Sequence, residues 1–244
     1  MNIYSVSDID ALVKGNSYVG RGIVIGKSED GKKAAFAYFI MGRSENSRNR
    51  VFREEGDAVT IYPYDESKVK DPSLIIYSPV RKHHNSVIVT NGDQTDTIYN
   101  YLQEGKTFEQ ALETRCFEPD APNFTPRISG ILYFAEYDFT YKLSILKSAD
   151  ECGSACNRYT FSYTALNGLG HFIHTYNCDG NPIPTFTGEP ERVKIPNDIH
   201  AFAQKLWGNL DENNKISLYV RYTDLSSGEY EKVLINKNEG GKNR

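Results

Sequence analysis

Short runs of β-branched and aromatic residues, separated by turn residues, fill most of the first ninety positions. Such runs are typical of β-strands. The run at 18–26 reads YVGRGIVIG, and Asp30 and Gly31 after it form a hairpin signal. The segment 34–41 is therefore predicted to be the returning strand. Further strands are predicted at 58–64, 74–77 and 86–90.

The hydrophobic period changes near residue 95 to the three- and four-residue spacing of an amphipathic helix. This helix is predicted to end at Gly105. Thr107 then caps a second helix, and Gln110 three residues later completes a capping box. Two short helices therefore follow about five strands.

Strand patterns resume after a proline-rich stretch. A helix with Asp198 as its N-cap is predicted over 198–206. The predicted strands of this half lie at 128–137, 141–146, 159–163, 171–176, 216–222 and 230–235, and the last two form a hairpin.

The order of elements is strands, two helices, strands, one helix and strands. This order favours an α+β fold with mainly antiparallel sheets over an alternating βαβ fold. Two stacked sheets with helices outside, a four-layer αββα sandwich, would bury both faces of each sheet. We expect one domain over 1–244, with 1–17 as an N-terminal extension and 238–244 as a flexible polar tail.

Composition narrows the classes of function. A net charge of -4, a pI of about 5.8 and a mean hydropathy of -0.54 indicate a soluble globular protein and argue against a general nucleic-acid binder. No apolar run reaches membrane length, and Asp8 and Asp10 interrupt any signal-peptide core. We interpret the four cysteines as free thiols, although Cys152 and Cys156 could also be read as a metal or redox pair. A cytoplasmic protein without nucleic-acid or membrane partners is expected.

Three arginines are crowded into FIMGRSENSRNRVF, at 39–52, directly after a predicted strand. Guanidinium groups match carboxylate or phosphate oxygens in pairs. Arg43, Arg48 and Arg50 therefore indicate an anion site, and Asn49 adds an amide that can recognise a polar edge. The alternative is a solvated loop.

The stretch TNGDQTDTI, at 90–98, leads from a strand into a helix. Free backbone N–H groups at a helix N-terminus bind phosphate readily. Simple capping by Thr95 or Asp96 explains the same residues equally well.

Two histidine pairs are candidate metal ligands. His83 and His84 would point to opposite faces of a strand, and so would His171 and His174. We therefore predict no metal site.

Glu118 offers a carboxylate near Arg127 within the proline-rich stretch 117–128. The stretch could be a catalytic edge or an ordinary surface loop. No nucleophile elbow, P-loop, dinucleotide-binding or HExxH motif is present. The residues alone thus predict an anion pocket built from several loops, without naming a reaction.

The same segments, taken in order, resemble the archaeal-type IMP cyclohydrolases. The matching stretches are YVGRGIVIGK (18–27), GRSENSRNR (42–50), IIYSPVR (75–81), TNGDQTDTI (90–98) and FTPRISG (124–130). The resemblance implies a fold like that of the N-terminal-nucleophile hydrolases, without use of the N-terminal nucleophile. It also implies ring closure of 5-formamidoimidazole-4-carboxamide ribotide to IMP and water, with no cofactor.

The resemblance further implies which residues act. Arg50, Tyr77 and Glu118 are the expected catalytic residues. The expected substrate-binding residues are Arg21, Asn49, Asn91, Thr95, Asp96, Thr97 and Arg127. The alternative function is a non-catalytic or divergent nucleotide-binding or amide-hydrolase relative of the same fold. Relatives of the fold often assemble symmetrically, and the sequence leaves the oligomeric state open.

Overall fold

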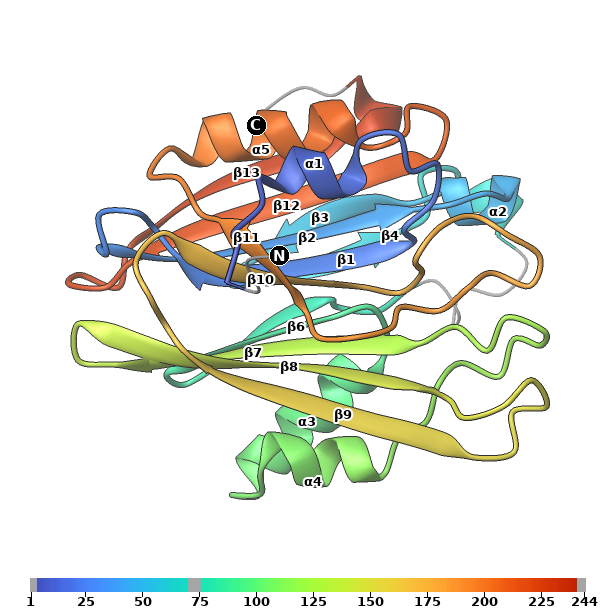
Figure 1. Ribbon diagram of the computed structural model, residues 1–244, viewed down its shortest axis with the longest axis horizontal. Helices are drawn as coiled ribbons and strands as arrows, with labels where there is room; N and C mark the ends of the chain where they lie inside the picture. Colours follow the sequence, from blue (N-terminus) through green and yellow to red (C-terminus); the bar gives the residue numbers. More distant parts are fainter. Residues whose placement is uncertain (1–3, 70–75, 241–244) are drawn as a thin grey trace.

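The structure is a computed structural model that describes residues 4–69 and 76–240 of the chain. Two antiparallel sheets lie face to face (Figure 1). The first has the order β11 (Glu191–Lys194), β10 (Leu169–His174), β1 (Arg21–Lys27), β2 (Lys33–Met41), β12 (Lys215–Asp224) and β13 (Tyr230–Asn236). The second has the order β3 (Val51–Glu55), β4 (Ala58–Tyr62), β5 (Val80–His83), β6 (Ser86–Thr90), β7 (Arg127–Ala135), β8 (Asp138–Ser148) and β9 (Cys156–Thr164).

Helices cover the outer face of each sheet. The first sheet is covered by α1 (Ile9–Val13) and α5 (Ile199–Asn209), and the second by α3 (Gln94–Gln103) and α4 (Phe108–Glu113) (Figure 1). The predicted α+β sandwich of four layers is thus confirmed. The likeness to N-terminal-nucleophile hydrolases stays a prediction. Among the helices of the described ranges, none has the length and apolarity needed to cross a bilayer.

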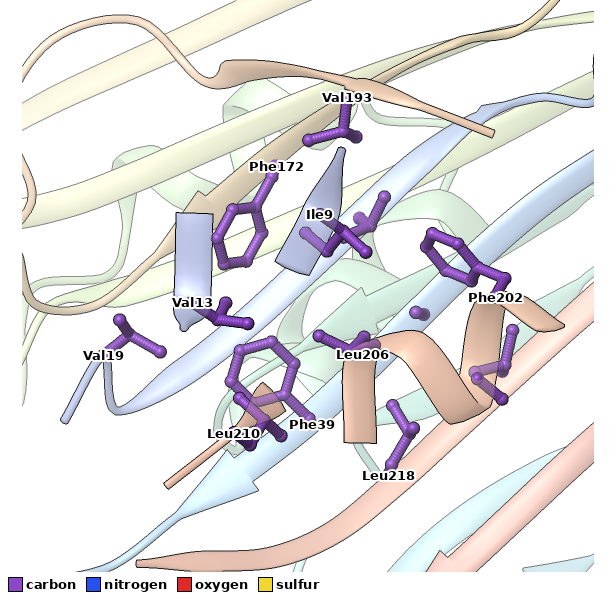
Figure 2. Packing of buried hydrophobic residues seen from close by; sticks show 14 of the residues in the cluster. Ile9, Val13, Val19, Phe39, Phe172, Val193, Phe202, Leu206, Leu210 and Leu218 are labelled. Carbon is purple, nitrogen blue, oxygen red and sulfur yellow. The ribbon is translucent and has the colours of Figure 1, made fainter. Parts of the chain in front are cut away.

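Strand β2 shows how the layers arise from sequence. Successive side chains of a strand point to opposite faces, and KAAFAYFIM is apolar on both. Phe36 and Tyr38 point between the sheets, whereas Ala37 and Phe39 point toward the helices. Figure 2 shows Phe39 in the helix-side core, packed among side chains from α1 and α5 such as Leu206.

Local signals placed several turns and caps correctly. Asp30 and Gly31 lie in the β1–β2 hairpin, where Gly31 has a φ of 74°. Thr107 and Gln110 form the predicted capping box at the start of α4. Asp198 accepts two backbone N–H groups at the start of α5.

Other predictions were incomplete. The sequence reading missed four short strands and helices: α1, β3, β5 and β11, together with the single turn α2 (Glu45–Arg48). Of the strand predicted at 74–77, residues 74 and 75 lie outside the described residues, and 76 and 77 are not in a strand. Residues 241–244 of the predicted tail are likewise outside, and the chain before them forms the short 3-10 helix η3 (Lys237–Glu239).

The expected geometry of one histidine pair was wrong. His83 ends β5, and His84 lies in the following turn with a φ of 50°. Their rings contact each other with centroids 4.4 Å apart instead of pointing to opposite faces. Within the described ranges, no group of three or more His, Cys, Asp or Glu is arranged to hold a metal.

Candidate active site

A cavity of about 530 Å³ opens where the ends of the two sheets meet. Its volume is in the range of small-molecule sites. Residues from both sheets and from four loops line it: Arg21, Arg50, Tyr77, Asn91, Gly92, Asp93, Glu118, Pro119, Asp120 and Arg127. Six of the ten residues proposed from sequence are therefore brought together here.

Arg21 and Arg50 face this cavity near Glu118, but neither forms an ion pair with a residue that the structure describes. Arg21 begins β1, and its backbone N–H donates to Thr175 Oγ1 at 3.1 Å, while Arg50 directly precedes β3. Neither guanidinium bonds to any residue that the structure describes, and the Nε atom of each is buried. Burial lowers the pKa of Arg50, and the neighbouring charge of Arg21 lowers it further. Because arginine stays charged near neutral pH, these two side chains favour an anionic guest.

Tyr77 lies just before β5, where its backbone carbonyl accepts from the Ile61 N–H at 2.9 Å. Its phenol oxygen is 3.3 Å from that of Tyr38 on β2. Burial raises the pKa of Tyr77, and the positive charges of Arg21 and Arg50 offset only part of the rise. The phenol therefore stays protonated near neutral pH and can donate a hydrogen bond into the cavity.

Glu118 is held by a tightly bonded loop. Its backbone N–H donates to Thr125 O at 2.9 Å, and the Thr125 N–H donates to Asp120 Oδ1 at 2.6 Å. Thr125 Oγ1 also bonds Tyr176 Oη at 2.6 Å, which ties this loop to the other sheet. Burial raises the pKa of Glu118, although the Arg21 charge opposes the rise. A carboxyl of this kind can hold or release a proton closer to neutral pH than an exposed glutamate.

Arg127 belongs to a charge cluster at the start of α3. Its Nη1 atom lies 2.7 Å from Asp93 Oδ1 and 2.8 Å from Gln94 Oε1. Arg115 Nη2 also donates to Asp93 at 2.6 Å. Two guanidiniums thus share one carboxylate, which leaves a net positive charge beside a helix N-terminus. Gly92 permits this packing, because a Cβ there would lie 2.5 Å from Arg127 Nη1.

Asn91 lines the cavity, but its amide is bonded to two backbone groups and to the Gln94 side chain. It donates to Pro126 O at 2.9 Å, and its oxygen accepts from Ile128 N and Gln94 Nε2, each at 2.9 Å. These bonds join the turn after β6 to the start of β7. The side chain therefore shapes the cavity wall instead of offering free donors.

Asn49 lies outside the cavity. Its side chain donates to Asp65 O at 2.8 Å and accepts from Asp65 N at 2.7 Å. The amide thus holds the chain that precedes Arg50 against a neighbouring loop.

Thr95, Asp96 and Thr97 do not line the cavity either. Thr95 is fully buried, Thr97 is half-buried on α3, and Asp96 accepts from Arg81 Nη1 at 2.6 Å. Asp93 holds the N-cap position. The helix end that faces the cavity therefore lies earlier in the chain than the sequence suggested.

The arginine-rich stretch does not act as one cluster. Arg43 pairs with Asp179 at 2.5 Å, and Arg48 donates to Gly42 O and to Asn214 Oδ1 at 3.0 and 2.9 Å. Only Arg50 of the three lines the cavity. The expectation that three guanidiniums gather around one anion was therefore wrong.

Sequence reasoning missed several residues of this region. Asp93 and Gln94 stand inside TNGDQTDTI and carried a detectable signal, because they open the helix. Tyr38, Tyr176 and Arg115 carried none, since their contacts join segments that lie far apart in the chain.

Comparison with known proteins agrees with this picture. The model of the family described as "IMP cyclohydrolase-like protein" matches residues 18–228. An IMP cyclohydrolase of Methanococcus aeolicus is 29% identical over 173 residues, which cover 66% of this chain and 75% of that protein. An IMP cyclohydrolase of Methanocaldococcus jannaschii is 28% identical over 184 residues, which cover 70% of this chain and 81% of that protein. An IMP cyclohydrolase of Methanopyrus kandleri is 36% identical over 118 residues, which cover 47% of this chain and 58% of that protein.

Proposed function

Because the chain belongs to the IMP cyclohydrolase-like family, we propose that it closes the ring of 5-formamidoimidazole-4-carboxamide ribotide to give IMP and water. The observation that carries the proposal is the single cavity shared by Arg21, Arg50, Tyr77 and Glu118. These residues come from four separate segments and combine unpaired positive charge with two proton-bearing groups. A mere nucleotide binder would need the arginines alone.

The reaction makes one C–N bond and releases one water. The carboxamide nitrogen attacks the formyl carbon, and a proton passes from that nitrogen to the formyl oxygen. The resulting hydroxyl then leaves as water with a second proton, while the former formamide nitrogen loses its own proton and a C=N bond forms. An amide nitrogen is a weak nucleophile, so the site must orient it, stabilise the negative oxygen and move protons.

The cavity offers groups for each task. Arg21 and Arg50 would stabilise the oxygen that becomes negative, because neither guanidinium forms an ion pair or a hydrogen bond with a described residue. Tyr77, which stays protonated, would donate to the same oxygen. Glu118, with its raised pKa, would accept a proton from nitrogen and return one to the leaving hydroxyl.

The charge cluster at α3 suits the 5′-phosphate. Arg115 and Arg127 share the single carboxylate of Asp93, and the helix N-terminus adds a partial positive charge. We infer that the phosphate lies at this end and the two amide arms at the Arg50 end. The substrate would then span the cavity, and no cofactor takes part. A cytoplasmic location and assembly into oligomers stay predictions from the sequence.

The direct test is to mix the purified protein with the formamido ribotide and follow IMP formation by absorbance. Glu118→Gln should abolish most turnover, whereas Arg48→Ala, which alters an arginine outside the cavity, should keep it. Absence of product from a protein whose melting temperature rises with IMP would identify a nucleotide-binding relative instead.

A further inference from the structure

A second, smaller cavity lies at the other end of the sandwich, with a volume of about 190 Å³. Hairpin ends of both sheets line it: Lys82, His84, Asn85, Ser86, Val87, Phe134, Ala135, Arg221, Thr223, Asp224, Leu225 and Gly228. Ser86 begins β6, whereas Asn91 of the first cavity follows the end of β6. The length of a strand thus separates the two cavities.

Arg221 is the unusual residue of this second cavity. It is only 2% exposed. Its Nε donates to Thr223 Oγ1 at 3.3 Å, and its guanidinium lies 3.5 Å from the centroid of the Tyr230 ring. The Nη1 atom is buried without a hydrogen-bond partner, and no carboxylate among the described residues forms an ion pair with it. A buried charge without a counter-ion is costly. An anion bound beside the Arg221 guanidinium would reduce this cost.

Buried arginine nitrogens without a hydrogen-bond partner also occur at the first cavity. Among the described residues, the arginines with a buried nitrogen that lacks a partner are Arg21, Arg50 and Arg221. The first two line the candidate active site, where an anionic substrate would neutralise them. The third lines the cavity at the opposite end.

Two more basic side chains, those of Lys82 and His84, line the second cavity together with Arg221. Lys82 Nζ also lies 3.5 Å from Asp57 Oδ2. The one carboxylate in the lining, that of Asp224, already accepts from the backbone N–H groups of Ser226 and Ser227, each at 2.9 Å. Both of these bonds go to Asp224 Oδ1, and the carboxylate stays ionised. The positive charge of the lining that has no ion-pair partner among the described residues is therefore that of Arg221.

We propose that Arg221, with Lys82 and His84, forms a binding site for a small oxyanion of the phosphate class, separate from the candidate active site. The volume is below the range of about 300–1,000 Å³ that is usual for sites enclosing a drug-sized ligand. The cavity therefore accepts a phosphate group but not a whole nucleotide. The group can come from inorganic phosphate or from the phosphate end of a sugar ester whose remainder stays outside.

The test uses full-length protein in which Arg21→Gln, Arg50→Gln and Arg127→Gln have removed the three arginines that line the first cavity. Inorganic phosphate, titrated calorimetrically against chloride of equal ionic strength, should still bind this protein. Adding Arg221→Gln should weaken binding by about tenfold or more, the effect of losing one charge-assisted hydrogen bond. Adding Arg53→Gln, which changes an exposed arginine paired with Glu239, should leave binding unchanged.

Two results would overturn the proposal: no phosphate binding by the triply substituted protein, or equal binding after Arg221→Gln. If Arg221→Gln prevents folding, Lys82→Gln and His84→Gln provide the test, because both residues are exposed. Each substitution should weaken phosphate binding. Unchanged affinity in both variants would refute the site. Repeating the titration with ribose 5-phosphate separates the two sources. If ribose 5-phosphate binds more tightly than inorganic phosphate, the ligand of this site is a phosphate ester. If it binds more weakly, the ligand is the free phosphate ion.

Discussion

The phenol oxygens of Tyr38 and Tyr77 lie 3.3 Å apart, and this contact joins the candidate active site to the centre of the sandwich. Tyr38 is fully buried, and its ring stacks on Phe52 with centroids 5.5 Å apart. Its hydroxyl has no other side-chain partner in the described part of the chain. If Tyr38 donates in this bond, the proton of Tyr77 is free to point into the cavity.

Tyr38→Phe should therefore slow turnover while leaving the packing in place. Loss of one hydrogen bond of about 1 kcal/mol predicts a fall in kcat of roughly fivefold to tenfold, with little change in KM. Because the Tyr38 bond lowers the pKa of Tyr77, its loss should also move the alkaline limb of the kcat profile to higher pH. Tyr141→Phe is the control, since that buried phenol bonds His171 outside the cavity. An unchanged pH profile would show that Tyr38 does not act through Tyr77.

Glu118 should make the stability of the protein depend on pH. Burial raises the pKa of this carboxyl above its ordinary value of 4.5. The folded protein then binds the proton more tightly than the unfolded chain, so stability is greatest below 4.5 and falls as pH rises through the raised pKa. Glu118→Gln, which cannot ionise, should melt at a higher temperature than the natural protein near neutral pH and equally near pH 4.

The same Glu118→Gln variant should lose about 100-fold or more in kcat, the usual size of a general acid–base contribution. Glu113→Gln, at an exposed position on α4, should alter neither turnover nor the pH dependence of melting. Full activity of Glu118→Gln would remove this carboxyl from the proposed proton transfers.

Arg50 should stabilise the ligand complex at the expense of the free protein. Its half-buried charge has no described partner, so Arg50→Met should raise the unfolding free energy of the ligand-free protein by about 1 kcal/mol. The rise in melting temperature that we expect IMP to cause in the natural protein should disappear. Arg48→Met should have the opposite effect on stability, because it removes bonds to Gly42 and Asn214. Lower stability of ligand-free Arg50→Met would mean that the charge is compensated within the fold.

The fold was largely predictable because its long strands carry strong local patterns. The predicted strands at 34–41 and 86–90 agree closely with β2 and β6, since every position of both is buried or nearly so. The missed strands β5 and β11, with the sequences VRKH and ERVK, are four residues long and rich in charge. β5 is a strand because it pairs with β4 and β6, and β11 because it pairs with β10.

The sequence predicted the chemistry of the site, but it did not predict which residues line the cavity. The sequence indicated arginines around an anion, yet nothing local separates Arg50 from Arg43. That difference arises because Arg43 meets Asp179, 136 residues away. Asn49 illustrates the same limit, since its amide is used by the backbone of Asp65. Contacts between distant segments decide which polar side chains stay free for a ligand.

Gly92 should control the position of Arg127 without controlling the fold. A methyl group there would lie 2.5 Å from Arg127 Nη1 and 2.6 Å from Gln94 Oε1, which are the mobile ends of flexible side chains. Gly92→Ala should therefore fold, displace the guanidinium and raise KM by about tenfold, with a smaller effect on kcat. Gly208→Ala is the matched control: this exposed position on α5 has open space, so the change should stabilise the protein by about 0.5–1 kcal/mol and leave KM unaltered. An unchanged KM in Gly92→Ala would show that Arg127 does not hold the substrate.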